Sequence, residues 1–177
     1  MPQGRPPISA QLKRDLLVEA GHRCAIPTCR AAEPLEFEHI DDWAKVKKHE
    51  FANMIVLCRN CHGRKGSRPG QIDRKALMQY KANLAVVNGR YGELELRILD
   101  AVARKPLQTE FVLPAYMGLM VSYLIKDGLL RRHETMQDYK VRTEGIFALD
   151  LSVAQWYEIT EKGIDFIERW KSARPLD

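Results

Sequence analysis

Four cysteines and a set of polar side chains close to them in the sequence are the residues that could do chemistry. The cysteines form two close pairs, C-x4-C and C-x2-C, with 28 residues between the pairs. This arrangement favours a tetrahedral zinc site over disulfides, with a set of unrelated buried thiols as the alternative. Four thiolates leave no position for a substrate, so the predicted zinc is structural. Its predicted ligands are Cys24, Cys29, Cys58 and Cys61.

Polar residues between and beside these cysteines could hydrolyse a phosphodiester bond. Glu38 offers a hard oxygen to Mg²⁺ or Mn²⁺, and His62 could supply a second ligand while leaving positions open for water and phosphate. His39 could accept a proton from water near neutral pH, and Asn53 could orient its ring. A single histidine is more often structural, so it is the combination that favours metal-assisted hydrolysis.

Three stretches of sequence carry a resemblance to a known family. EHI, then ANMIVLC, then CRNCH resemble the HNH endonuclease motif in its zinc-knuckle form, the ββα-metal nuclease fold, over about residues 22–66. The resemblance implies that His39 is the general base and that Asn53 steadies it. It also implies that Glu38 and His62 bind a catalytic Mg²⁺ or Mn²⁺. An activated water would attack the phosphorus and leave 5′-phosphate and 3′-hydroxyl ends.

The sequence departs from the family pattern in ways that affect the predicted site. The proline and glycine that usually follow the first histidine are absent, so the connection between the strands must differ. Gly66 stands where some relatives carry another histidine, which leaves two protein ligands and favours a water-rich ion such as Mg²⁺. Because neighbours in a strand point to opposite faces, Glu38 and His39 can share a site only at a strand end or bend. Asp41 and Asp42 could substitute for Glu38 as ligands.

Basic residues flank the motif, and the charge of the chain is uneven. Residues 1–90 carry a formal charge of +7 and residues 91–177 carry −2. A basic surface attracts the phosphates of DNA, although a solvated face is the ordinary explanation for such charges. We therefore predict DNA as the partner, held by backbone contacts that do not read its sequence. The predicted contacts are Lys45, Lys47, Lys48, Arg59, Arg64, Lys65 and Arg68.

Local patterns in the first half predict the elements that position these residues. Ser9 is expected to cap a helix over residues 10–20. Residues 35–40 and 53–58 are expected to be short strands that could pair, and residues 74–87 have helical spacing that NGRYG at 88–92 breaks. Three histidines without partners at useful spacing are predicted to lie on the surface: His22, His49 and His133.

The second half is expected to be a small α+β module that resembles a winged-helix domain. Its expected elements are helices over 94–102 and 114–128, a hairpin over 141–160 and a closing helix over 161–170. Leu119, Tyr123 and Leu124 are expected in its core. The resemblance rests on apolar pattern and turn placement, and the negative charge argues against simple duplex binding. DNA contact, protein contact, self-association and signal sensing stay open.

These patterns together predict an α+β fold with two domains. A zinc-stabilised ββα-metal (HNH) nuclease domain with an N-terminal helix is expected at residues 1–88. A winged-helix-like domain for targeting, regulation or association is expected at residues 89–177, where a second copy of the chain or a regulatory partner could bind. The predicted activity is metal-dependent DNA hydrolysis with His39 as the base, in phage defence or encoded by a phage.

The alternative is a non-catalytic, zinc-containing DNA-binding regulator. Such a scaffold needs the thiols but has no use for the ordered glutamate, histidine, asparagine and histidine, so the sequence favours the enzyme. The start of the sequence is not typical of a signal peptide, and no apolar run reaches the length of a membrane span. The expected location is the cytoplasm of a bacterial or phage-infected cell.

Overall fold

The computed structural model describes residues 4–133, 139–142 and 150–176 of the chain. The chain forms two compact units, one of residues 1–89 with 169–177 and the other of residues 90–168. The C-terminal residues belong to the first unit through specific contacts. The Tyr80 hydroxyl donates to the Lys171 carbonyl at 3.0 Å, and the Asn83 amide donates to the Arg174 carbonyl at 2.9 Å.

A two-stranded antiparallel sheet lies at the centre of the first unit. Its strands are β1, Leu35–His39, and β2, Met54–Cys58, as the sequence predicts. The register pairs Leu35 with Cys58 and His39 with Met54, with no bulge between these ends. Alternation along an unbroken strand therefore directs Glu38 to one face of the sheet and His39 to the other.

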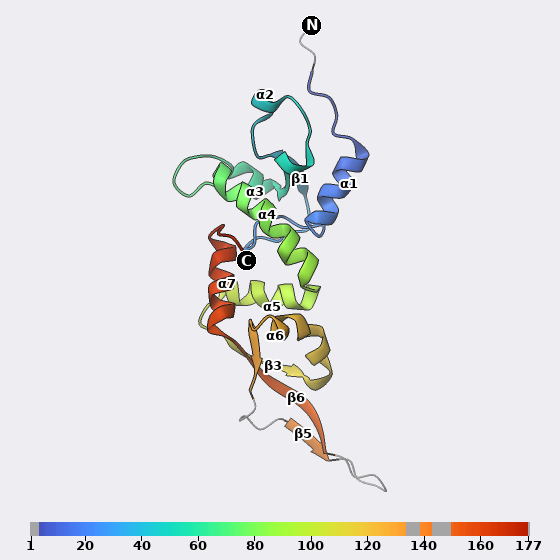
Figure 1. The fold of residues 1–177 in the computed structure, drawn as a ribbon, viewed down its shortest axis with the longest axis vertical. Helices are drawn as coiled ribbons and strands as arrows, with labels where there is room; N and C mark the ends of the chain where they lie inside the picture. The colour runs from blue at the N-terminus through green and yellow to red at the C-terminus, as the bar shows by residue number, and fades with distance from the viewer. Residues whose placement is uncertain (1–3, 134–138, 143–149, 177) are drawn as a thin grey trace. The chain divides into compact units, whose positions relative to one another are not determined.

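Helices cover both faces of this sheet (Figure 1). On the face of His39, Leu16 of α1, Ala10–Glu19, packs with Met54 and Val56. On the face of Glu38, Leu77 and Leu84 of α4, Arg74–Arg90, pack with Ile55 and Leu57 and with the cysteines. Ser9 caps α1 by accepting from the Leu12 amide, which confirms the predicted helix start.

Short elements connect the strands and lead into α4. They are α2, Trp43–Val46, the 3₁₀ helix η1, Phe51–Asn53, and α3, Arg59–Gly63. The stretch NGRYG at 88–92 breaks the following helix as predicted, although α4 continues to Arg90, three residues beyond the predicted end at residue 87. Asn88 lies inside the helix with its side chain fixed. It donates to the Glu19 carbonyl at 2.7 Å and accepts from Arg30 at 3.3 Å.

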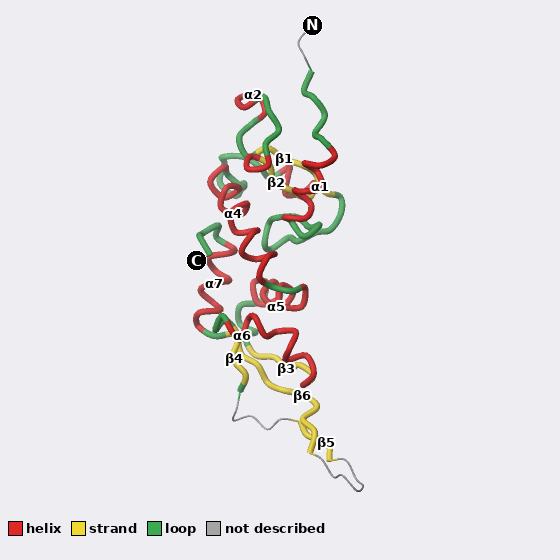
Figure 2. The backbone as a smooth tube through the Cα atoms, turned by 45° about the vertical axis from the view of Figure 1, so that its right-hand side comes forward, coloured by secondary structure: helices red, strands yellow, loops and turns green. Residues whose placement is uncertain are grey.

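The second unit combines a sheet with helices (Figure 2). The strand order is β3–β6–β4, and β5 also pairs with β6. The elements are α5, Glu93–Arg104; β3, Glu110–Pro114; the 3₁₀ helix η2, Ala115–Val121; α6, Ser122–Lys126; β4, Leu130–Arg132; β5, Tyr139–Arg142; β6, Asp150–Ile159; and α7, Glu161–Lys171. The strand β3 was not predicted, because it is short and ends in a proline at the sheet edge. The central part of the hairpin predicted at 141–160 lies outside the described residues.

The core of the second unit differs from its prediction in part. Leu124 is fully buried, but Leu119 is 84% exposed and Tyr123 is 47% exposed. The buried Glu95 explains the local order, because its carboxylate accepts from the amides of Tyr123 and Leu124 where α6 begins. The two exposed side chains therefore belong to a surface. Within the described ranges, no helix is both long and apolar enough to span a membrane.

Candidate metal centre and active site

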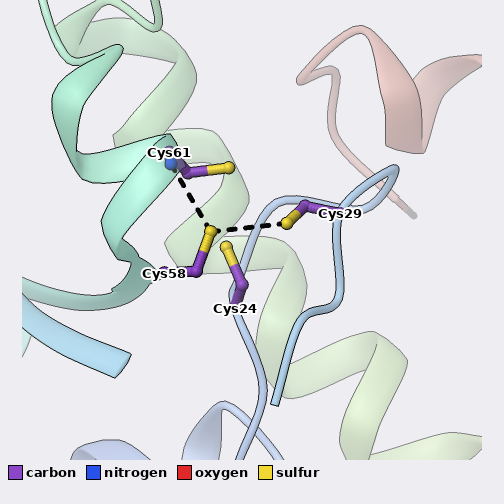
Figure 3. Close-up of side chains that lie close together, drawn as sticks. All are labelled: Cys24, Cys29, Cys58 and Cys61. Atoms are coloured by element: carbon purple, nitrogen blue, oxygen red, sulfur yellow. Dashed lines mark hydrogen bonds between the residues drawn. The ribbon is translucent and has the colours of Figure 1, made fainter. Parts of the chain in front are cut away.

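The four cysteines converge as the sequence predicts. Cys24 and Cys29 come from the turn after α1, Cys58 ends β2, and Cys61 lies on α3 (Figure 3). All four sulfurs lie within 4.8 Å of one another, and the Cys29 and Cys58 sulfurs are 3.5 Å apart. A zinc ion about 2.3 Å from each of four sulfurs requires sulfurs about 3.8 Å apart. The cluster therefore fits a tetrahedral zinc ion, and its cysteines are free of disulfides.

The surroundings of the thiols explain why they need a cation. Burial raises the pKa of the Cys24 thiol to about 11, and burial also raises the pKa of Cys61 far above its usual range. Burial opposes the ionisation of Cys58 too, but the Cys61 amide and the neighbouring thiols donate to its sulfur and lower its pKa. Zinc ligation requires thiolates, so binding of the ion would release protons from at least the two thiols with raised pKa values.

A second constellation lies on the face of β1 that carries Glu36 and Glu38. The His62 ring, on α3, stands between the two carboxylates. Its Nε2 atom is 2.6 Å from Glu38 and its Nδ1 atom is 2.5 Å from Glu36. An imidazole whose Nδ1–H donates to a carboxylate presents Nε2 as a ligand in a fixed orientation. Glu38 and His62 thus offer one oxygen and one nitrogen side by side, which suits Mg²⁺ or Mn²⁺ with water in its remaining positions.

Lys65 joins this constellation to the end of β1. Its ammonium donates to the Glu38 carboxylate at 2.8 Å, to the His39 carbonyl at 2.7 Å and to the Asp42 carboxylate at 2.8 Å. Burial alone would lower the pKa of Lys65, but the two carboxylates raise it, so the side chain is a cation at neutral pH. A cavity of about 320 Å³ opens beside it, with Lys45 and Arg74 in its wall.

His39 lies on the other face of the sheet and has different neighbours. Its side chain is almost fully buried, with 2% exposed. Arg5 donates to its Nδ1 atom at 2.9 Å, and the Nδ1 atom of His49 lies 3.2 Å from its Nε2 atom. Burial lowers the pKa of His39 and the Arg5 cation lowers it further, which keeps the ring neutral near pH 7. The nearby Glu38 carboxylate raises the pKa of this ring slightly against those effects, but no hydrogen bond or ion pair joins the ring to Glu38 or His62 among the described residues.

Asn53 acts on the backbone instead of on the imidazole. Its amide accepts from the Asp41 N–H at 2.8 Å and donates to the Asp41 carbonyl at 3.0 Å. Its own carbonyl accepts from the Ile40 N–H at 2.8 Å. The expectation that Asn53 steadies the His39 ring directly is therefore wrong. The residue fixes the chain just after His39, and so acts on the end of β1.

The basic residues predicted to contact DNA lie mostly on the surface. Lys65 is half-buried in the cluster just described, and the other six are exposed. Lys48 pairs with Glu50 at 2.6 Å, and Arg64 donates to the Gly70 carbonyl at 3.5 Å. Exposure makes contact with a polyanion possible at these positions, and only the charge of Lys48 has a carboxylate partner among the two contacts just named.

Comparison with known families identifies the part of the chain that holds the cysteines and the predicted catalytic residues. Residues 22–68 match the family model described as HNH endonuclease. Residues 22–68 are an HNH domain. All four cysteines and the four predicted catalytic residues fall inside the HNH domain. No curated protein and no solved structure matches the chain. The match does not reach residues 89–177, so the similarity of that part to winged-helix domains stays a prediction.

Four residues near the site were not predicted to act there. Glu36 could have been found, because it stands two residues before Glu38 in a strand and must share its face. Arg5 and Trp43 carry no comparable signal, since a chain segment outside the motif and a short helix bring them to His39. His49 was predicted to lie on the surface without partners, and this is wrong. Its ring contacts both His39 and Trp43.

The second unit has its own group of potential ligands, on Glu110, His133 and Glu158, whose atoms lie within 4.8 Å of one another. The Nε2 atom of His133 is 3.4 Å from the Glu158 carboxylate. His133 was predicted to lie on the surface; it is half-buried, and its Nε2 atom makes no hydrogen bond in the part of the chain that the structure describes. Arg131 already pairs with Glu158 at 2.5 Å and holds the pKa of that carboxyl below its usual range, so these contacts form an ion-pair network on the sheet.

Proposed function

We propose that the chain is a metal-dependent DNA endonuclease that hydrolyses phosphodiester bonds, with His39 as the general base. The observation that carries this proposal is the position of His62 between two carboxylates inside an HNH domain. Its contacts leave a nitrogen of His62 and an oxygen of Glu38 2.6 Å apart. A bound Mg²⁺ or Mn²⁺ would supply positive charge for the phosphate and its leaving oxygen.

The chain's own residues supply the remaining steps. His39 is neutral near pH 7 because burial lowers its pKa. Its Nδ1 atom, which accepts from Arg5, could take the proton of an attacking water once Arg5 moves away. Lys65 keeps its charge and lies against Glu38, where it can contact a nonbridging phosphate oxygen. Glu36 orients His62, and Asn53 fixes the backbone after His39. The zinc cluster holds α3 against β2 and so positions His62 without touching substrate.

The end of β1 is where the scissile phosphate would lie. His39 is the last residue of the strand, and its carbonyl shares Lys65 with the Glu38 carboxylate. The cavity beside Lys65 lies just after this end of the strand, with Ile40, Asp41 and Asp42 in its wall. Glu38 and His39 point to opposite faces, so their joint action on one phosphate is part of this proposal and requires His39 to become accessible when substrate binds.

DNA is the proposed substrate because the positive charge of the chain lies in residues 1–90. Exposed basic side chains around the HNH domain would hold its backbone at a strength that falls with salt. Residues 89–177 would target or control cleavage, as a winged-helix-like module or through a partner. A role in phage defence, in the cytoplasm of a bacterial or infected cell, belongs to the same proposal.

A second candidate is a non-catalytic zinc module that binds DNA. One observation favours it, namely that both ring nitrogens of the buried His39 already have partners. A general base needs one nitrogen free, so Arg5 would have to leave Nδ1 when substrate binds. An incoming phosphate provides a reason, because a guanidinium binds phosphate in a charge-assisted, bidentate manner.

Plasmid cleavage separates the two candidates. The full-length protein with Mg²⁺ or Mn²⁺ should nick supercoiled DNA, and His39→Ala should lose that activity by about 100-fold or more. His22→Asn is the matched control, since His22 is exposed and asparagine tolerates its positive φ of 54°. Equal zinc content in all three proteins would show that the fold is intact. A His39→Ala protein with full activity would remove His39 from the mechanism.

A further inference from the structure

His49 lies outside the HNH motif residues but touches the proposed base, and its contacts fix where the protons lie. The Nε2 atom of His49 is 2.8 Å from the Pro6 carbonyl, which can only accept a hydrogen bond. His49 must therefore carry its proton on Nε2, and in the neutral ring its Nδ1 is an acceptor. That acceptor faces Nε2 of His39 at 3.2 Å.

The same reasoning then fixes the tautomer of His39. Because Nδ1 of His49 is an acceptor, Nε2 of His39 must carry a proton and donate it to that atom. The lone pair of the neutral His39 ring then lies on its Nδ1. The guanidinium of Arg5, which can only donate, lies 2.9 Å from that Nδ1. All of these contacts agree with one arrangement of protons.

We propose that His49 is a positioning residue for the general base: by accepting from Nε2–H, it holds His39 in the tautomer whose Nδ1 can take a proton from water. This rests on the proposed nuclease function. His49 itself needs to touch neither substrate nor metal.

Packing is the competing explanation for His49, and two substitutions separate the explanations. The His49 ring lies 4.7 Å from the Trp43 ring and 5.1 Å from the His39 ring, measured between centroids. His49→Phe keeps an aromatic ring there and removes the acceptor. His49→Asn removes the ring and keeps an acceptor, because its Oδ1 takes the place of Nδ1. A packing role favours the phenylalanine variant, whereas a positioning role favours the asparagine variant.

The experiment is steady-state nicking by the full-length, zinc-loaded protein, together with ¹⁵N spectra of its histidines. We expect His49→Phe to lower kcat by about 10-fold or more with little change in KM, and His49→Asn to retain most activity. The ¹⁵N signals of His39 should show a proton on Nε2 in the wild type and in His49→Asn, with a mixture of tautomers in His49→Phe.

The outcomes distinguish this inference from the function on which it rests. If His39→Ala is inactive while His49→Phe is fully active and its His39 tautomer is unchanged, the positioning role is overturned and the nuclease stands. If His49→Phe is more active than His49→Asn, the positioning role is also overturned, and His49 acts through packing. If His39→Ala still nicks DNA, the proposed mechanism itself fails. The tautomer of His39 is readable in either case, because it does not depend on activity.

Discussion

The thiol cluster and the carboxylate–histidine constellation lie one residue apart on α3, yet they are built for different tasks. Cys61 belongs to a closed, mostly buried set of four identical ligands. His62, the next residue, is 42% exposed at its side chain and meets two exposed or half-buried carboxylates. A closed shell of four sulfurs can only hold structure, whereas an oxygen and a nitrogen beside solvent leave positions for water and substrate. The comparison teaches that ligand number and exposure distinguish the proposed structural site from the proposed reactive one.

The largest expected effect is a loss of folding when one cysteine of the four-cysteine site is removed. Cys58→Ala should abolish zinc binding and unfold the first unit, because metal binding and folding are coupled in such small sites. Elemental analysis should give about one zinc per chain for the wild type and none for the variant. Thermal unfolding followed by circular dichroism should show the loss of structure. Asn60→Ala, at an exposed position between Cys58 and Cys61, should keep both zinc and fold.

An intermediate effect, a loss of nicking activity without loss of zinc, is expected when a carboxylate beside His62 is neutralised. Glu38→Gln should lower Mg²⁺-dependent nicking by about 100-fold, because it weakens a charged ligand for the catalytic ion. Glu36→Gln is its matched partner on the same face and should cost about 10-fold, since Glu36 only orients His62. When activity is measured against Mg²⁺ concentration, Glu36→Gln should raise the Mg²⁺ concentration needed for half-maximal activity less than Glu38→Gln does. Equal losses would mean that the two carboxylates have the same role.

The smallest effect is a pH dependence of stability that comes from the buried His39. Its pKa in the folded protein lies below the ordinary value of 6.5. As the pH falls below 6.5, the unfolded chain gains a proton that the folded chain does not, so stability falls until the folded pKa is reached. Thermal unfolding between about pH 5 and pH 7.5, without added divalent ion, should show a flatter curve for His39→Gln than for the wild type. Parallel curves would contradict the depressed pKa.

The sequence predicted the thiol cluster well because its information is local. Each pair of cysteines is close in the chain, so the spacing alone indicates the ligand set. The strand pair was predictable for a similar reason, since the alternation over Leu35–His39 is written in consecutive residues. The contact of Glu38 with His62 followed from the resemblance of EHI and CRNCH to a known motif. These features need no knowledge of which distant segments meet.

The environment of His39 could not be predicted, because it depends on contacts between segments. Arg5 reaches the ring across 34 positions of the chain and His49 across 10, and neither carries a periodic pattern. The role of Asn53 was missed because an amide can bind either a ring or a peptide group, and only the turn after β1 decides between them. The exposure of Leu119 and Tyr123 was missed because apolar spacing does not show whether a partner element covers a helix.

The measurement that tests the central claim most directly is made on His62→Ala, because this residue separates the two sites. Zinc content and plasmid nicking should be determined on the same preparation of the full-length protein. The account predicts that the variant keeps about one zinc per chain and loses Mg²⁺-dependent nicking. A variant that loses zinc together with activity, or that keeps both, would contradict a structural zinc site and a separate catalytic one.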